Sequence, residues 1–146
     1  LDEPTSGLDV LSRDELMDIL SDYVADGEHS VIFSTHITAD LERCADFLTY
    51  ITHGMLYYSG PKDEFEDAFR LVKGGPDELT DGLQRAMVGI RTYATGFDAL
   101  VRTQDIPHIG GTDGLLTQHA SIEDVIRLTN AAEHTAIGNT NKGDVR

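Results

Sequence analysis

The alternation of hydrophobic and polar positions in the first part of the chain predicts a helix followed by a buried strand. Residues 1–9 read as a polar loop, with Leu1 as the last residue of a strand. A helix then begins at Asp9 or Ser12 and ends at Gly27. A continuous apolar run over residues 30–35 is typical of a strand buried on both faces of a parallel sheet. The helix has one apolar face, formed by Leu16, Ile19, Leu20, Tyr23 and Val24.

The next stretch predicts a short helix over residues 38–45 and two strands, 47–52 and 55–59. His53-Gly54 separates these strands by two residues, which favours an antiparallel hairpin. A helix over residues 62–72 follows. Its inward side chains are expected to be Phe65, Ala68, Phe69 and Val72. The whole pattern predicts an α/β fold, with a parallel sheet and an antiparallel hairpin at its edge.

The segment Lys73-Gly74-Gly75-Pro76 is the best internal boundary, because glycine and proline interrupt regular structure. It separates a main domain, residues 1–75, from an accessory segment, residues 76–130. From Ala131 to residue 146 the chain is small and polar, and we expect a disordered tail.

The accessory segment is less regular and predicts a small α+β extension. Residues 88–93 favour a strand, residues 96–103 a short helix and residues 115–116 a brief strand. Residues 121–130 form an amphipathic helical pattern, in which Ser121 is expected to cap the helix.

Composition excludes several classes of protein. With 11 basic and 26 acidic residues, the 146-residue chain has a formal net charge of −15. This charge argues against nucleic acid as a direct partner, because phosphate binding requires Lys and Arg. A single cysteine, Cys44, excludes an internal disulfide and a Cys-rich zinc site, and fits a reducing compartment. The apolar runs are far shorter than the roughly 20 residues of a transmembrane helix.

Candidate chemistry gathers after the predicted strand ends. Asp2 and Glu3 follow one strand, and His36 follows another. Ligands of open α/β sheets bind at the carboxyl ends of strands. Two adjacent carboxylates can divide the work of phosphoanhydride hydrolysis, one holding a cation and the other facing a water. The histidine can contact a phosphate oxygen or place the water. Taken singly, these residues also fit an acidic surface loop and a strand-end histidine with structural partners.

The loop before the first helix is the third candidate. The sequence Ser6-Gly7-Leu8-Asp9 leads into a helix N-terminus, where backbone N–H groups bind anions. A helix cap without any ligand fits the same residues equally well. The 146 residues contain no Gly-x-x-x-x-Gly-Lys-Ser/Thr phosphate loop.

Taken together, residues 1–9 resemble the end of the Walker B strand and the D-loop of an ABC transporter ATPase. Ser34-Thr35-His36 resembles the switch-histidine segment of that family, and the similarity continues through residues 37–60. Residues 74–130 are more loosely similar to the C-terminal extension of exporter-type members, such as drug, peptide or antibiotic-resistance exporters. The resemblance implies part of a P-loop NTPase fold, of the RecA-like type, with a parallel sheet.

The resemblance also implies roles. Asp2 would hold Mg²⁺, through water, and Glu3 would be the general base or orient the attacking water. His36 would contact the γ-phosphate of ATP. The D-loop residues would cross to a second ATPase subunit, identical or different: Ser6, Gly7, Leu8 and Asp9.

A membrane-spanning transporter subunit would be the other partner, with the ATPase peripheral on the cytoplasmic face of the membrane. The Walker A loop, the Q-loop and the signature motif are missing, so we expect the C-terminal part of a longer ATPase, inactive alone. One alternative is a non-catalytic regulatory or binding module that reuses this half-fold. A small acidic Mg²⁺- or Ca²⁺-binding protein is less favoured, because the chain has no Asp-x-Asp-x-Asp-Gly loop.

Overall fold

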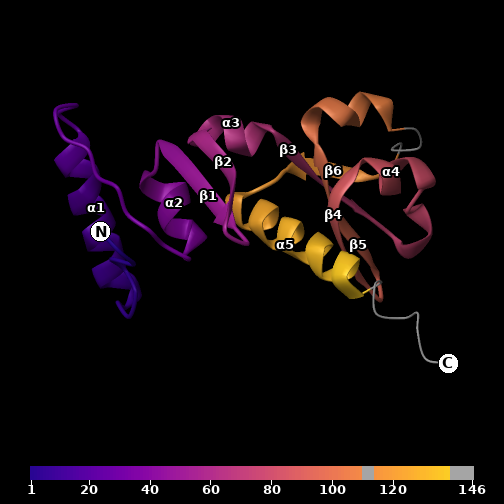
Figure 1. The fold of residues 1–146 in the computed structure, drawn as a ribbon, viewed down its shortest axis with the longest axis horizontal. Helices are drawn as coiled ribbons and strands as arrows, with labels where there is room; N and C mark the ends of the chain where they lie inside the picture. Colours follow the sequence, from indigo (N-terminus) through magenta and orange to yellow (C-terminus); the bar gives the residue numbers. More distant parts are fainter. Residues whose placement is uncertain (110–113, 139–146) are drawn as a thin grey trace. The chain divides into compact units, whose positions relative to one another are not determined.

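The computed structural model describes residues 1–109 and 114–138, which form two compact units (Figure 1). The first unit runs from Leu1 to Lys62, and the second begins at Asp63. The division therefore precedes the glycine pair at which the sequence pattern placed it, because residues just before that pair form a strand of the second unit. None of the described helices combines the length and the apolar composition needed to cross a bilayer.

The first unit contains two helices and one hairpin: α1 (Val10–Val24), α2 (Thr38–Cys44), β1 (Phe47–Thr52) and β2 (Met55–Pro61). The short helix and the antiparallel hairpin confirm the sequence prediction. His53 and Gly54 have φ angles of 49° and 73°, as a two-residue type I′ turn requires. The turn fixes the register, in which Thr52 pairs with Met55.

The predicted apolar face of α1 is wrong as a buried face. Met17 is the buried residue of this helix, whereas Ile19 and Tyr23 are 63% and 53% exposed. Helix α1 contacts α2 through polar and sulfur groups: the Cys44 thiol lies 3.5 Å from the Met17 sulfur. Arg43 also forms ion pairs with two carboxylates of α1. Periodicity identified the apolar residues of the helix but not what covers them.

The predicted strand over residues 30–35 is also wrong. The segment is extended, but it forms only an isolated parallel bridge, between Asp2 and Ser34. Ile32 is 89% exposed, because among the described residues only the first three pair with this segment. A strand buried in a parallel sheet needs a neighbour on each side. The α/β class is confirmed, but both sheets of the described chain are antiparallel.

The second unit contains an antiparallel sheet in which β4 (Met87–Tyr93) pairs with β5 (Gly96–Arg102), β5 with β3 (Phe69–Gly74), and β3 with β6 (Leu116–His119). Figure 1 labels these strands. Phe97, Ala99 and Val101 of β5 lie in the apolar core with Val72 and Leu83. Its elements, in chain order, are α3 (Lys62–Asp67), β3 (Phe69–Gly74), η1 (Pro76–Glu78), α4 (Asp81–Ala86), β4 (Met87–Tyr93), β5 (Gly96–Arg102), η2 (Thr103–His108), β6 (Leu116–His119) and α5 (Ile122–Gly138).

Two predicted helices of this region are wrong. The helix predicted over residues 62–72 ends at Asp67, and β3 follows it between β5 and β6. The helix predicted over residues 96–103 is β5, of which only Arg102 is exposed. Short apolar runs fit a buried strand and a buried helix equally well, and pairing on both edges favours the strand here. The strand predicted over residues 88–93 is confirmed as β4.

Helix α5 confirms the amphipathic pattern and packs against β4 and β5. Ile122, Val125 and Leu128 are fully or almost fully buried. The helix continues to Gly138, so the predicted tail is wrong for residues 131–138, and residues 139–146 lie outside the described chain. At Gly89 of β4 the helix comes very close: an added Cβ would lie 2.0 Å from the carbonyl oxygen of Leu128.

We expect Gly89→Ala to destabilise the second unit, because the obstructing atom belongs to helix backbone and cannot rotate away. Overpacking of this kind costs about 1–3 kcal/mol. Urea unfolding of the 146-residue chain measures the loss. Gly75→Ala is the matched control, since its added Cβ would meet only the flexible Glu78 side chain, at 3.4 Å. Equal stability of the two variants would contradict the close approach of α5 to β4.

Candidate functional site

The candidate site is built on two backbone segments that run parallel. The Leu1 nitrogen donates to the Ile32 carbonyl at 2.8 Å, and the Ser34 nitrogen donates to the Leu1 carbonyl at 3.0 Å. The Glu3 nitrogen then donates to the Ser34 carbonyl at 2.9 Å. Because the two segments point the same way, the residues that follow them emerge at one end. The structure thus brings the predicted carboxylate and histidine together.

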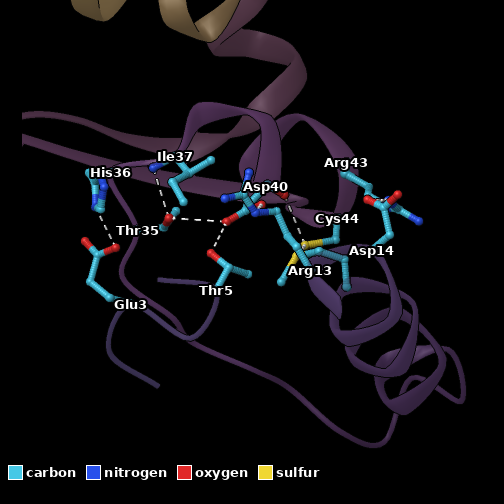
Figure 2. Close-up of polar contacts among 11 residues, drawn as sticks. Glu3, Thr5, Arg13, Asp14, Thr35, His36, Ile37, Asp40, Arg43 and Cys44 are labelled. Atoms are coloured by element: carbon cyan, nitrogen blue, oxygen red, sulfur yellow. Dashed lines mark hydrogen bonds and ion pairs between the residues drawn. The ribbon is translucent and has the colours of Figure 1, made fainter. Parts of the chain in front are cut away.

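Glu3 and His36 are in direct contact at this end (Figure 2). The Glu3 carboxylate oxygen Oε2 lies 2.7 Å from His36 Nδ1, although 33 residues separate them in sequence. The two side chains are 36% and 72% exposed, so a ligand in solution can reach them. Glu3 has a φ angle of 46°, in the left-handed region that residues other than glycine rarely adopt. A non-glycine residue held in this conformation is a feature often found at functional sites.

Asp2 points to a different partner. The Ser34 hydroxyl donates to the Asp2 carboxylate, and both side chains are exposed. A carboxylate and a hydroxyl are hard oxygen donors of the kind that Mg²⁺ prefers. Within residues 1–109 and 114–138, no three His, Cys, Asp or Glu side chains gather as a metal-binding group. Any ion at Asp2 would therefore need water or substrate oxygens as further ligands.

Residues 6–9 form an exposed loop between this pair and α1. The Ser6 nitrogen donates to the Glu3 carbonyl at 3.1 Å, and the Leu8 nitrogen donates to the Thr5 carbonyl at 3.1 Å. Gly7 has a φ angle of 79°, which is why glycine suits this turn. The side chains of Ser6 and Leu8 are exposed, so they are available to another surface.

Asp9 is the N-cap of α1, which settles the choice between Asp9 and Ser12. Its carboxylate accepts hydrogen bonds from the backbone nitrogen and the hydroxyl of Ser12, both at 3.0 Å. The backbone bond first, and then the hydroxyl bond, lower the pKa of the Asp9 carboxyl from its ordinary value of 3.8. The loop therefore caps helix α1 through Asp9. The exposed side chains of Ser6 and Leu8 take no part in this cap.

Asp40, labelled in Figure 2, carries a buried carboxylate that the sequence patterns did not single out. Asp40 is 2% exposed and Thr5 is fully buried. The Thr5 hydroxyl donates to Asp40 Oδ2 at 2.5 Å, and the Thr35 hydroxyl lies 3.4 Å from the same oxygen. The other oxygen, Oδ1, lies 4.0 Å from Nε of Arg13. An acidic residue in the first turn of a helix is common, so this burial could not be predicted from the sequence pattern.

Cys44 adjoins the same group. Its thiol donates to the Asp40 carbonyl oxygen at 3.2 Å. Burial, and then the charge of Asp40, raise the pKa of the Cys44 thiol above its ordinary value of 9.0. A raised pKa disfavours the thiolate, which is the reactive form. These surroundings therefore favour an unreactive Cys44 thiol.

We expect the Asp9 cap to stabilise α1 in a pH-dependent way. Because its folded pKa is lowered, this contribution is present above about pH 3.8 and is lost as the pH falls through the folded value. Asp9→Asn retains a neutral acceptor and removes the titration. The stability difference between wild type and this variant, from urea unfolding followed by circular dichroism, should therefore shrink between about pH 6 and pH 3. A difference that does not change with pH would contradict the cap.

Comparison with known proteins gives relatives of one kind. No family model matches the chain. It is 42% identical over 74 residues to the energy-coupling factor transporter ATP-binding protein EcfA2 of Lactobacillus delbrueckii subsp. bulgaricus, which covers 50% of the chain and 25% of that relative. It is 32% identical over 98 residues to a putative ABC transporter ATP-binding protein of Mycoplasma pneumoniae, covering 64% of the chain and 29% of the relative.

A third relative is the lantibiotic transport ATP-binding protein SrtF of Streptococcus pyogenes, 34% identical over 67 residues, with 46% of the chain and 29% of the relative covered. The chain thus spans less than a third of the length of each of these relatives. What it resembles in sequence is the ATP-binding proteins of ABC transporters.

Proposed function

We propose that this chain is part of an ATP-hydrolysing subunit of an ABC transporter and carries the residues that act on the terminal phosphate. The observation that carries the proposal is the contact between Glu3 and His36, which are distant in sequence and adjacent in space. The names of the relatives support it, since each is an ATP-binding protein of a transport system. A carboxylate beside a histidine on an exposed edge suits a reaction that moves a proton from water.

In the proposed reaction, a water attacks the γ-phosphorus of ATP, and the bond from that phosphorus to the leaving ADP oxygen breaks. Glu3 accepts the proton of the water, or orients it, and phosphate is released. The Glu3 carboxylate occupies Nδ1 of His36, so Nε2 is the nitrogen left for the ligand. In the doubly protonated imidazole, Nε2 donates a hydrogen bond to a γ-phosphate oxygen.

Mg²⁺ fits the donor set next to this pair. Asp2 would hold the ion through water, as Mg²⁺ usually retains several waters and takes one or two carboxylates besides phosphate oxygens. The ion would neutralise phosphate charge. The Ser34 hydroxyl donates to the Asp2 carboxylate, and a parallel bridge joins these two residues, which lie one position before Glu3 and two positions before His36 in the sequence. This bridge also supports the proposed parallel sheet, in which the extended segments of residues 1–3 and 30–35 would lie side by side.

Binding of the nucleotide would need a phosphate loop in addition to the residues of this chain. The 146 residues contain no phosphate loop, and the chain spans less than a third of the length of each relative described above. We therefore propose that other parts of a longer ATPase wrap the triphosphate, and that this chain alone does not hydrolyse ATP. Residues 1–75 would be the C-terminal part of the catalytic domain, with Walker B, D-loop and switch histidine, and residues 76–130 an accessory segment.

The exposed loop supports the proposed partners. Ser6, Gly7, Leu8 and Asp9 would form the D-loop against a second ATPase subunit, and a membrane-spanning subunit would complete the transporter. We propose that the protein would lie on the cytoplasmic face of the membrane, as a peripheral subunit. An export direction is supported by the similarity of residues 74–130 to exporter-type extensions.

We expect Glu3→Gln to abolish ATP turnover in the full-length natural polypeptide that contains this chain. Losing a general base lowers kcat by on the order of 100- to 10,000-fold. ATP binding should be unchanged, because the amide keeps the size of the carboxylate. Turnover is measured as phosphate release and binding by equilibrium titration. Glu15→Gln, at an exposed position of α1, is the matched control and should leave both unchanged.

Two results would overturn parts of this proposal. Full hydrolysis by Glu3→Gln would exclude Glu3 as the general base. A wild-type polypeptide that binds its transporter partner but hydrolyses no ATP would instead favour a non-catalytic regulatory or binding module.

A further inference from the structure

We propose that Asp40 is a positioning residue for this site: through Thr5 its buried carboxylate holds the loop that carries Glu3 against the segment that carries His36. The proposal rests on the proposed function, since it concerns the geometry of the same pair. Asp40 and Thr5 would touch neither ATP nor water. They would act only by setting where the Glu3 carboxylate and the His36 imidazole lie.

The exposed pair cannot fix its own geometry. Glu3 and His36 are 36% and 72% exposed, and a contact between exposed charged groups contributes little net free energy. The bond between Thr5 and Asp40 is different, because both residues are buried. Removing a partner from a buried carboxylate leaves it without compensation for the lost hydration. The buried bond therefore resists displacement, whereas the exposed one does not.

The contacts of Asp40 connect it to the chain near both members of the pair, as Figure 2 shows. Thr5 lies two residues after Glu3, and Asp40 lies four residues after His36. Thr35, directly before His36, places its hydroxyl 3.4 Å from Asp40 Oδ2 and also accepts a hydrogen bond from the Ile37 nitrogen at 3.0 Å. The Asp40 carboxylate therefore contacts Thr5, which follows Glu3, and Thr35, which precedes His36. Asp40 itself follows His36 in the chain.

The Asp40 carboxylate also faces residues on both sides of the loop of residues 6–9. Thr5 precedes this loop, and Arg13 follows it in α1. Both face the Asp40 carboxylate, Thr5 at Oδ2 and Arg13 at Oδ1, 4.0 Å away. Within the described chain, the buried Nε of Arg13 makes no hydrogen bond, so this ion pair is its polar partner. The residues that flank the proposed D-loop, Thr5 and Arg13, therefore both face the Asp40 carboxylate. A partner subunit at this loop would be connected through Asp40 to Glu3 and His36.

The test uses Thr5→Val, which keeps the shape of the side chain and removes its hydroxyl. In the full-length polypeptide we expect kcat for ATP hydrolysis to fall by on the order of 10- to 100-fold, as expected when a reacting group is misplaced by about 1 Å. KM for ATP should not change. Thr5→Ser restores the hydroxyl and should restore kcat. Thr49→Val, the same change at an exposed position of β1, is the control and should have no effect.

A double-mutant cycle separates positioning from a merely structural role. If Thr5 acts by placing Glu3, then Thr5→Val should add almost nothing to the loss caused by Glu3→Gln. A general loss of structure would instead lower the residual rate further and raise KM. Should Thr5→Val fail to fold, Asp40→Asn serves in its place, since the amide oxygen still accepts from Thr5 while the charge that faces Arg13 is gone. We then expect a smaller fall in kcat, again at unchanged KM.

The outcomes distinguish the two proposals. A wild type without ATPase activity overturns the proposed hydrolysis, and an active Glu3→Gln overturns the role proposed for Glu3; either result overturns this inference as well. An inactive Glu3→Gln together with a fully active Thr5→Val overturns this inference alone. Equal losses in Thr5→Val and Thr5→Ser, or additive losses in the cycle, also overturn it.

Discussion

The burial of one carboxylate constrains the first unit more than any apolar contact does. In the described residues 1–62, the buried apolar side chains are Met17 and Leu48, and the buried polar ones are Thr5 and Asp40. So small an apolar core cannot by itself fix the path of a loop. A buried ion carries a desolvation penalty of several kcal/mol unless its partners are in place, so the backbone must bring hydroxyl and guanidinium groups to Asp40. The geometry of the exposed site follows from that requirement.

The second unit obeys a different constraint, because an apolar core holds it. Leu83, Phe97 and Val101 are almost inaccessible to solvent, and α5 closes over β4 at a glycine. Dense packing of this kind tolerates little change in volume. The two units therefore depend on different interactions. The first depends on the hydrogen bonds and the ion pair of one buried carboxylate, and the second depends on a closely packed apolar core.

This difference explains how far the sequence could predict the structure. The hairpin of β1 and β2 was predictable, because a two-residue turn with positive φ angles is a local signal. The meeting of Glu3 with His36 was predictable from the rule that parallel segments end at one edge. The exposure of Ile32 was not predictable, since an apolar run does not show which segments will pack against it. The strand β5 was not either, because buried strands and helices share the same apolar composition. Asp40 gave no signal, since its burial depends on a threonine 35 residues away.

The described residues of the first unit form the candidate site, although binding of the proposed ligand would also require other parts of a longer ATPase. The hydrogen bonds described above for Glu3, His36, Asp2 and Asp40 join residues of the first unit. Under the proposed function, the rest of a longer ATPase would supply the grip on the triphosphate, whereas the geometry of the hydrolytic pair would come from these residues alone. The exposed loop of residues 6–9 lies between the two tied ends, at Thr5 and at α1. A partner that docks on that loop would therefore change the positions of Glu3 and His36 through the buried Asp40 carboxylate, without contacting either residue.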